Sequence, residues 1–430
     1  MHGSEATPPA ISRRRRCAGH PTPAWLRQLC WPAALVLLAT AGVANAETDC
    51  ATLTSAVDAA SALDPAQGEI EARATLAAAI RDDAGRWISG SASVRGSWLS
   101  DRYSDTVGLR EYEGGINLPL RLPGERDALQ TEAQAASRTV DDAEALRRLD
   151  VAARVRETLW DTLAARAQAA MADHEVEHLT ELRDLVARRT ARGDAAALEL
   201  DLIEGELAAA RAVRARADGE ARAALEQWRR VTGCAEPAPD AAETPAEATA
   251  TRLADGHPAL ELAGALRNGA SARLAASRAR PGQAPMVGLT LRRERGQAQA
   301  PWIDAVGVSV TMPIGGSGAR VRAEAVAAQE LAVADADRLR LRRALDATLR
   351  SAKVRMEASA AAHEATGERL VYAEQALARA RLAWEAGEWD TVDLLRVEGM
   401  TAEARLSEEL ARIEVRRAIA RLNQAAGVTP

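Results

Sequence analysis

The chain has 430 residues, of which 47% are hydrophobic and 27% are charged. This composition is sufficient to bury a sizeable core, and it excludes a disordered or collagen-like chain. The 55 lysines and arginines are outnumbered by 61 aspartates and glutamates, which leaves a net charge of -6. A nucleic-acid-binding protein normally carries a clustered basic surface, so no nucleic-acid partner is expected.

The first 46 residues have the three-part plan of a secretory signal peptide. Arginines at 13–16 and 27 precede an apolar stretch from Leu29 to Val43, and Ala44-Asn45-Ala46 supplies the small residues of a cleavage site before Glu47. The alternative, an N-terminal transmembrane anchor, would need about 20 apolar residues. The mature chain is therefore expected in the periplasm, outside the cell, or in an outer membrane that it spans by strands.

The two halves of the chain resemble each other at an offset of 194 positions. The matching features are Leu118-Pro119-Leu120 with Met312-Pro313-Ile314, Gly124 with Gly318, Arg126 with Arg320, Gly193 with Gly387, Leu200 with Leu394, Glu204 with Glu398, Gly205 with Gly399, Arg211 with Arg405, and Gly233 with Gly427. A segment rich in Pro, Glu, Ala and Thr separates the halves. These features predict a first repeat at 47–233, a linker at 234–252 and a second repeat at 253–430.

Each repeat contains a predicted β-hairpin, at 87–118 and at 286–313. In the first strand, from Ile88 to Trp98, apolar residues and glycines alternate with serines and an arginine. Strands of this length and alternation are typical of a barrel wall with one side towards lipid and the other towards a lumen. A soluble sheet with one buried face fits the pattern equally well. Five aromatic residues lie in or beside the strands, as in the girdles of outer-membrane barrels: Trp87, Trp98, Tyr103, Tyr112 and Trp302.

Four strands cannot close a barrel, because about eight are the practical minimum. A barrel would therefore need strands from several chains.

A short helix is predicted before each hairpin and two long helices after it, at 124–192 and 194–232 in the first repeat and at 318–386 and 388–426 in the second. The paired glycines Gly193 and Gly387 mark tight turns, while Gly233 and Gly427 suit helix C-termini. A seven-residue series of mostly large residues, with small ones three places on, predicts coiled-coil packing in the second repeat. The series is Leu349, Met356, His363, Leu370, Leu377 and Trp384, with Ala352, Ser359, Thr366, Ala373 and Ala380.

Two of the four cysteines, Cys50 and Cys234, remain after the predicted cleavage. In an oxidising periplasm they are able to form a disulfide that closes a long loop. Two buried thiols are the alternative. Acylation of Cys50 is not expected, because Thr48-Asp49 precedes it instead of the apolar and small residues of a lipoprotein site.

The segment from His174 to His178 matches the H-E-x-x-H pattern, which on a helix puts two imidazoles on one face for zinc. It lies inside a predicted long helix, with neither a third ligand nor a substrate cleft in view. A zinc metalloprotease is therefore the least favoured function, and His174 with His178 is a weak candidate for an incidental metal pair. A solvated helix face is the preferred interpretation. No catalytic residue and no cofactor is expected.

These features together resemble the TolC-type outer-membrane efflux channels over essentially the whole mature chain. The matches are the Asp64-Pro65 and His257-Pro258 helix starts, the Leu118-Pro119 and Met312-Pro313 strand exits, and the stretch from Ala386 to Leu395. That stretch is close to a family signature in which alanine and glycine precede a Ser or Thr and an Asp-Leu-Leu.

The resemblance implies an α+β fold, a tandem repeat of long coiled-coil helices with two β-hairpins per chain. It implies a homotrimer whose twelve strands form one barrel in outer-membrane lipid and whose helices form a periplasmic tunnel. It also implies a passive exit duct, not an enzyme, with a periplasmic adaptor (membrane fusion) protein and an inner-membrane efflux pump as partners.

Functional positions are carried over from the family residue by residue. Asp393 resembles the first of two acidic rings at the channel constriction, and Arg396 stands at the second. Trp384, Trp389 and Glu199 stand near the tunnel mouth, where family members often carry a Tyr and Arg latch, so a latch here must differ. Gly193 and Gly387 are expected at the turns that meet the adaptor.

The segment from Leu120 to Arg126 resembles the strand exit of heavy-metal exporters of this family, which leaves a metal cargo open. Two other classes of protein remain as alternatives. A periplasmic adaptor would have one helical hairpin within β-domains instead of two tandem copies, and a coiled-coil scaffold would lack the strand alternation.

Overall fold

A computed structural model describes residues 50–104, 107–237, 242–245, 253, 256–280, 283–314 and 318–430. The predicted signal peptide, residues 1–46, and most of the predicted linker at 234–252 lie outside the described residues. The helices are α1 (Leu53–Leu63), α2 (Gln67–Gly85), α3 (Pro123–Arg192), α4 (Ala197–Thr232), α5 (Pro258–Ala279), α6 (Gly318–Glu385) and α7 (Thr391–Ala425). The strands are β1 (Ser93–Ser100), β2 (Arg110–Pro119), β3 (Met286–Arg295) and β4 (Ile303–Thr311).

The first repeat begins with two helices where the sequence analysis expects one. The chain breaks between α1 and α2 at Asp64-Pro65, and the Asp64 carboxylate accepts bonds from the guanidinium groups of Arg147 and Arg154 on α3 at 3.2 and 3.1 Å. These two arginines lower the pKa of Asp64, against the desolvation that raises it. A proline after a buried, ion-paired aspartate interrupts the helix, because proline lacks the amide donor and restricts the residue before it.

The long helices α3 and α6 have bounds close to those predicted, whereas the return helices α4 and α7 begin three residues later than predicted. The delay has a geometric cause. Gly193 and Gly387 adopt left-handed φ angles of 81° and 76°, and the chain then needs a few more residues to reverse before a new helix begins. No side chain or backbone atom lies within 4 Å of where a Cβ would stand at either glycine.

The four strands form one antiparallel sheet in the order β1-β2-β3-β4, so the two hairpins lie side by side and β2 pairs with β3. The first strand begins at Ser93, five residues later than the alternation predicts. Gly90 has a φ of 97°, which interrupts the extended backbone, and Ile88 makes only an isolated bridge to Leu120. Between β1 and β2 the Asp101 carboxylate accepts bonds from the amides of Gly108 and Leu109 at 2.7 and 2.9 Å.

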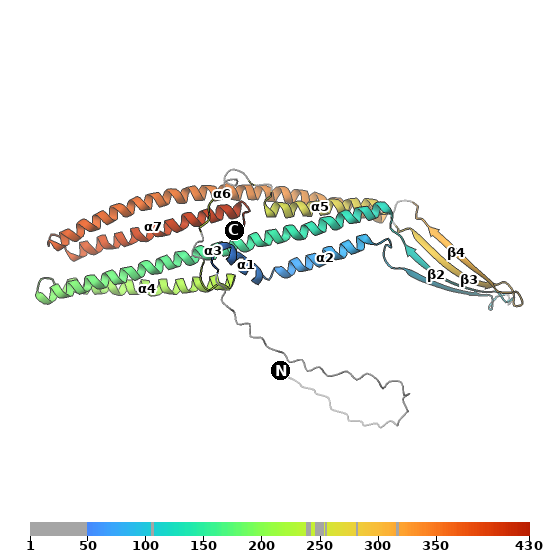
Figure 1. Ribbon diagram of the computed structural model, residues 1–430, viewed down its shortest axis with the longest axis horizontal. Coiled ribbons are helices and arrows are strands. Elements are labelled where there is room, and N and C mark those ends of the chain that lie inside the picture. Colours follow the sequence, from blue (N-terminus) through green and yellow to red (C-terminus); the bar gives the residue numbers. More distant parts are fainter. Residues whose placement is uncertain are drawn as a thin grey trace, which may run out of the picture. The chain divides into compact units, whose positions relative to one another are not determined.

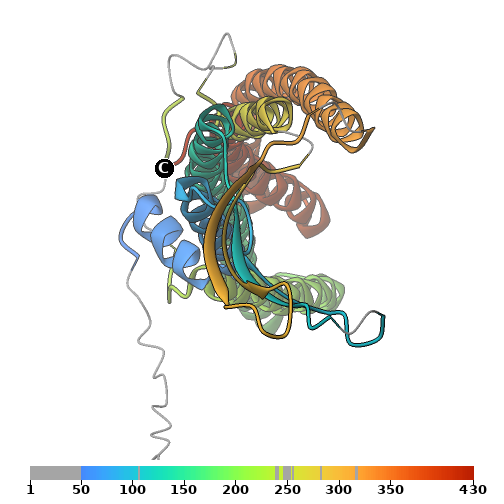
Figure 2. The ribbon, with the colours of Figure 1, turned by 90° about the vertical axis from the view of Figure 1, so that its right-hand side faces the viewer.

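Helix α3 is the centre of the helical part. It packs against α4 in one antiparallel hairpin and also against α2, α5 and α7, while α6 packs against α5 and α7 (Figure 1). The sheet continues from one end of the helices, and the turns at Gly193 and Gly387 lie at the other end (Figure 1). In the end-on view the sheet is curved across its strands (Figure 2).

The main apolar core gathers where α1, α3, α4 and α7 meet, around Trp160 and Trp228. The Cys50–Cys234 disulfide lies within this core, with the two Cα atoms 5.9 Å apart. It ties the segment before α1 to the end of α4. The chain thus contains the bonded alternative of the two that the sequence leaves open.

Beside this core, Arg156 joins the two repeats through an ion pair and hydrogen bonds. The buried Arg156 guanidinium on α3 donates to both carboxylate oxygens of Glu243 at 2.8 and 2.6 Å. It also donates to Gln424 at 2.5 Å and to the Val428 carbonyl at 3.0 Å. Glu243 belongs to the short described segment 242–245, which is thus held against the end of α7.

The predicted seven-residue series lies on one face of α6. Every member of both rows is buried or half-buried, whereas most other positions on α6 are exposed. This face meets α7, where the Thr401 hydroxyl bonds the Ala373 carbonyl at 3.3 Å and Arg405 pairs with Glu374 at 3.3 Å. The periodicity therefore identifies the packing face correctly. Among the described residues, no helix combines the length and the apolarity needed to cross a membrane.

Candidate channel wall and helix-tip contacts

The two faces of the sheet differ sharply in polarity. Paired positions across the four strands put the aliphatic side chains on one side, which we call the apolar face, and nearly all of them are exposed. The apolar face comprises Val94, Gly96 and Trp98 on β1, Tyr112, Gly114, Ile116 and Leu118 on β2, Val287, Leu289 and Leu291 on β3, and Val306, Val308 and Val310 on β4. An exposed apolar surface of this extent indicates contact with lipid or with another protein.

The opposite side, the polar face, carries charges in ion pairs. The Arg292 guanidinium bonds the Glu111 carboxylate at 2.8 Å and also pairs with Glu294. Arg95 and Glu113 lie on the same face. The period-two pattern of the strands therefore separates an apolar surface from a charged one, as the sequence predicts.

Both edges of the sheet are open in the described part of the chain. β1 pairs only with β2, and β4 pairs only with β3, so each edge strand has a row of backbone amides and carbonyls without sheet partners. Open edges recruit further strands. The sheet thus has two edges, β1 and β4, at which further strands are able to pair.

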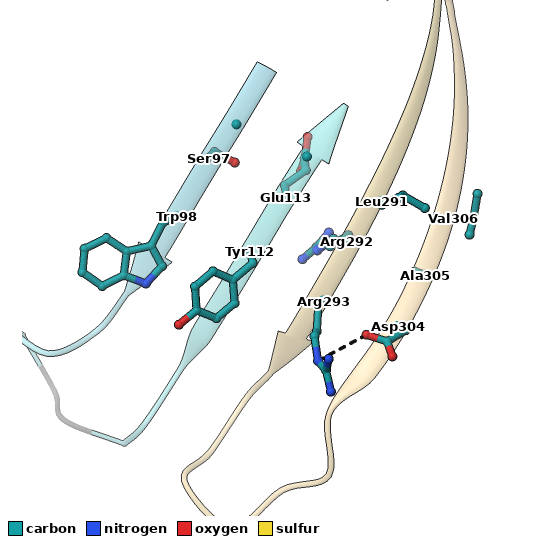
Figure 3. Close-up of a pocket in the computed structure, with 12 residues that line it drawn as sticks. Ser97, Trp98, Tyr112, Glu113, Leu291, Arg292, Arg293, Asp304, Ala305 and Val306 are labelled. Carbon is teal, nitrogen blue, oxygen red and sulfur yellow. Dashed lines mark ion pairs between the residues drawn. The ribbon is translucent and has the colours of Figure 1, made fainter. Parts of the chain in front are cut away.

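Aromatic and charged side chains form the last rows of the apolar face near the hairpin tips (Figure 3). Trp98 stands opposite Tyr112, and the Tyr112 ring lies 5.9 Å from the Trp302 ring, between centroids. Next to them Arg293 pairs with Asp304 at 3.5 Å. Aromatic rings at this level of a sheet are typical of a membrane interface.

The helix tips are joined across the repeats by a network around Trp384, near the end of α6. The buried Trp384 indole donates to the Thr391 hydroxyl at 3.2 Å, and that hydroxyl donates to the Glu199 carboxylate on α4. The Arg189 guanidinium lies 4.8 Å from the centroid of the Trp384 ring. Around these groups the apolar side chains of Val186, Ile203 and Leu394 are fully buried.

The other residues expected at the tips are arranged differently. Trp389 is exposed and lies outside the hydrogen-bonded network, although its backbone amide bonds the Ala383 carbonyl at 3.3 Å. Asp393 is half-buried in the first turn of α7, where its amide donates to the Asp390 carboxylate at 2.8 Å, and Arg396 is exposed one turn later. The structure therefore joins Trp384 to Glu199 but leaves Trp389 out.

The two histidines of the H-E-x-x-H segment have separate partners. His174 is exposed and lies 3.6 Å from Glu177 on its own helix. His178 bonds the Glu398 carboxylate on α7 at 2.8 Å, and Arg381 on α6 approaches the same oxygen at 3.4 Å. In the described ranges no three metal-ligating side chains are grouped to hold an ion.

The Glu398 carboxylate is almost fully buried, with 4% of its side chain exposed. Its hydrogen bond raises the pKa of His178 above the ordinary value, against the desolvation that lowers it. Burial raises the pKa of the neighbouring Glu175. The cluster is thus a charged contact between the two repeats inside the helical part.

No family model and no curated protein sequence matches this chain. Solved structures do. The outer membrane protein VceC from Vibrio cholerae aligns with a TM-score of 0.69 at 16% identity, over 87% of this chain and 96% of that one. The Campylobacter jejuni CmeC outer membrane channel aligns with a TM-score of 0.67 at 14% identity, over 87% and 85%. The open state of the Neisseria gonorrhoeae MtrE outer membrane channel aligns with a TM-score of 0.63 at 18% identity, over 88% and 89%.

This chain has the same fold as these channels. The likeness extends over nearly the whole of the described chain and of each neighbour, so it includes both the sheet and the long helices. The expected combination of two β-hairpins with tandem long helices is therefore correct at the level of one chain.

Three residues of these contacts were not singled out from the sequence: Thr391, Arg189 and Glu398 as the partner of His178. Thr391 is the Ser or Thr of the signature quoted above, so a signal for it was present. Glu398 was noted only as the repeat partner of Glu204. Its burial depends on α3 lying against α7, which no local pattern indicates.

Proposed function

We propose that three copies of this chain form an outer-membrane channel, the passive exit duct of a tripartite efflux system. The observation that carries the proposal is the four-stranded sheet with two open edges and an exposed apolar face, attached to helices of about 70 residues. Three such sheets joined edge to edge have twelve strands, which is more than the number that a closed barrel needs. The apolar face would then contact lipid, and the charged polar face would line the lumen.

The helices form the periplasmic part of the duct in this proposal. At 1.5 Å per residue, a helix of about 70 residues reaches roughly 100 Å, long enough to cross much of the periplasmic space. Helix α6 supports this assembly, because its exposed apolar side chains, including Val333, Leu339 and Val371, suit burial against a neighbouring copy.

The helix tips are the proposed gate and docking region. Asp393 would form a ring of three carboxylates at the constriction, with Arg396 beside it. The contact of Trp384, Thr391 and Glu199 would act as the latch that holds the tips of the two repeats together. The turns at Gly193 and Gly387 would meet a periplasmic adaptor protein, which links the channel to an inner-membrane pump.

The proposed pairing of β1 of one chain with β4 of the next offers the sharpest test of the trimer. Within one chain, β1 and β4 are separated by two strands, which puts them roughly 14 Å apart, too far for a disulfide. We would therefore introduce Ser97→Cys on β1 together with Ala305→Cys, Gly307→Cys or Ser309→Cys on β4, all on the polar face. After mild oxidation, at least one pair should give covalent dimers and trimers and nothing larger.

The matched control combines Ser97→Cys with Thr290→Cys on the interior strand β3, which should give no cross-linked species. The same preparations are fractionated and run with and without boiling, since a barrel remains with the outer membrane and shifts on the gel when boiled. Monomers only, or an unlimited ladder, would refute the closed trimer. Absence from the outer membrane would refute the location.

A further inference from the structure

The hairpin-tip end of the apolar face changes character over three successive rows of paired residues. The first row is aliphatic and small, with Gly96, Gly114, Leu291 and Val306. The second is aromatic and charged, with Trp98, Tyr112, Arg293 and Asp304, and the third is basic, with Arg110 opposite Arg295. Three arginines thus stand on this face with one carboxylate, Asp304, among them.

Two of these arginines lie against Trp302. The guanidinium carbons of Arg293 and Arg295 are 5.4 and 4.9 Å from the centre of its ring. Arg295 donates one bond, to the Ala298 carbonyl at 3.3 Å, while its Nε is buried without a partner among the described residues. Arg110 is exposed and has no ion pair within the described part of the chain. Stacking on Trp302 therefore holds Arg293 and Arg295 in place, and the three cations are only partly neutralised.

A hollow of about 680 Å³ reaches Arg293 and Asp304 and is also lined by Trp98, Tyr112, Leu291 and Val306 (Figure 3). Glu113 and Arg292 complete its charged lining. Its floor includes the facing pair Gly96 and Gly114, which have no side chains, and a Cβ at either would meet nothing within 4 Å. The hollow has aliphatic and aromatic side chains along the strands and ends at the Arg293–Asp304 pair, and Arg295 and Arg110 stand in the row beyond it. This is the polarity of an acyl chain that ends in an anionic head group.

We propose that Arg110, Arg293 and Arg295 bind a phosphate of a phosphorylated acyl lipid in the outer leaflet, with an acyl chain in the hollow. Guanidinium groups form paired, charge-assisted bonds to phosphate oxygens, and the Trp302 and Tyr112 rings sit where head group and acyl chain meet. The assignment rests on the proposed function, because it requires the apolar face to contact lipid. A free phosphate ion has no acyl chain to occupy the hollow, so a lipid is the favoured source of the phosphate group.

The test is lipid retention by the purified full-length mature protein in detergent, measured by native mass spectrometry. The probes are diphosphoryl lipid A, its dephosphorylated form and inorganic phosphate. The double variant Arg293→Gln, Arg295→Gln should bind diphosphoryl lipid A at least tenfold more weakly, and the dephosphorylated lipid should bind both proteins equally weakly. The control, Arg95→Gln, changes an arginine of the polar face that does not line the hollow and should retain the lipid as the wild type does.

Two further variants distinguish loss of the lipid site from misfolding and test the hollow separately from the arginines. Asp304→Asn releases Arg293 from its carboxylate and should strengthen binding severalfold, which a misfolded protein would not do. Gly114→Leu fills the hollow and should weaken retention of the phosphorylated lipid without changing the arginines.

Equal loss in Arg95→Gln, unchanged binding in the double variant, or displacement of the lipid by millimolar inorganic phosphate would each overturn the proposal. The heat-modifiability gel separates the two levels of inference. A protein that is heat-modifiable and resides in the outer membrane but fails to retain the lipid refutes only the lipid site.

Discussion

Helices α3 and α6 occupy the same place in the two repeats and have nearly the same length, but they differ greatly in burial. Twenty residues of α3 are buried, against five of α6. The difference arises because α3 is surrounded by α2, α4, α5 and α7, whereas α6 packs against α5 and α7. A sequence repeat therefore predicts the same element twice, but each copy takes its burial from its neighbours.

Single positions show the same asymmetry at the offset of 194. Trp160 on α3 is fully buried, and its counterpart Val354 on α6 is 63% exposed. Glu398 on α7 is buried against His178, whereas its counterpart Glu204 on α4 is exposed. Which member of a repeated pair is buried therefore differs from one position to the next: the first-repeat member at Trp160 and the second-repeat member at Glu398.

The largest expected difference between the repeats is at Trp160 and Val354. Trp160→Ala should lower the free energy of unfolding by about 3–5 kcal/mol, because it empties the centre of the main core. Val354→Ala should cost less than about 1.5 kcal/mol even if a second copy covers it, since two methyl groups are lost. Thermal unfolding followed by helical circular dichroism in detergent measures both. Equal losses would show that α6 is as buried as α3.

The disulfide has no equivalent in the second repeat, since neither Cys50 nor Cys234 has a cysteine counterpart there. Replacing both with serine should lower stability by about 2–4 kcal/mol, because the bond closes a loop across a sequence separation of 184. The measurement is the same unfolding transition with and without reductant. Peptide mapping of the unreduced protein that finds two alkylatable thiols would contradict the bond.

Glu199 and Asp393 are repeat counterparts, each the third residue of a return helix, and they should behave differently in a planar bilayer. Glu199→Ala removes the carboxylate that accepts from Thr391, so the open state should become roughly tenfold more populated. Asp393→Ala should leave opening unchanged but abolish most of the block by a polyvalent cation such as hexamminecobalt, because the proposed ring of charge is lost. Identical single-channel records for the two variants would rule out these separate roles.

The smallest expected effect is the pH dependence of the contact between His178 and Glu398. Since the pKa of His178 is raised in the folded chain, its stabilisation is complete below the unfolded value near 6.5 and is lost as the pH rises through the folded value. The loss should be roughly 1 kcal/mol, because the histidine is partly exposed and Arg381 opposes its charge. Burial also raises the pKa of Glu175, so the stabilisation that depends on this group is likewise lost as the pH rises, but at lower pH.

Unfolding midpoints between pH 5 and pH 9 measure this dependence. The slope around neutral pH should be smaller in His178→Gln and in Glu398→Gln. The control Glu204→Gln, at the exposed counterpart, should keep the wild-type slope. A wild-type slope in His178→Gln would exclude the histidine as its source.

Much of the fold was predictable from local sequence because its determinants are local. The bounds of α3 and α6 follow from long proline-free segments that end at glycines, and the faces of the sheet follow from a period of two. The start of β1 was misplaced because Gly90 interrupts a strand whose alternation continues past it. Asp64-Pro65 was identified as a helix start, but the separate helix α1 before it was not expected, and the Asp64 carboxylate at the break pairs with α3 arginines more than 80 positions away.

The candidate sites likewise divide into those with local determinants and those that depend on long-range contacts. Gly193 and Gly387 could be found as turns, since a left-handed φ favours glycine wherever it occurs. The contact from Glu199 through Thr391 to Trp384 could not be derived, because it joins side chains 192 positions apart whose meeting depends on how α4 approaches α6 and α7.

The sequence by itself determined the repeat, the helix lengths, the packing face of α6 and the two-sided strands, all of which depend on spacing along one segment. The tertiary structure alone decided which copy of each repeated residue is buried, that Cys50 reaches Cys234, and that His178 bonds Glu398 on α7 while His174 lies beside Glu177. Those outcomes depend on which segments, distant in the sequence, pack against each other. The two copies have the same local pattern but pack against different helices. For that reason, sequence symmetry between the repeats does not become symmetry of contacts.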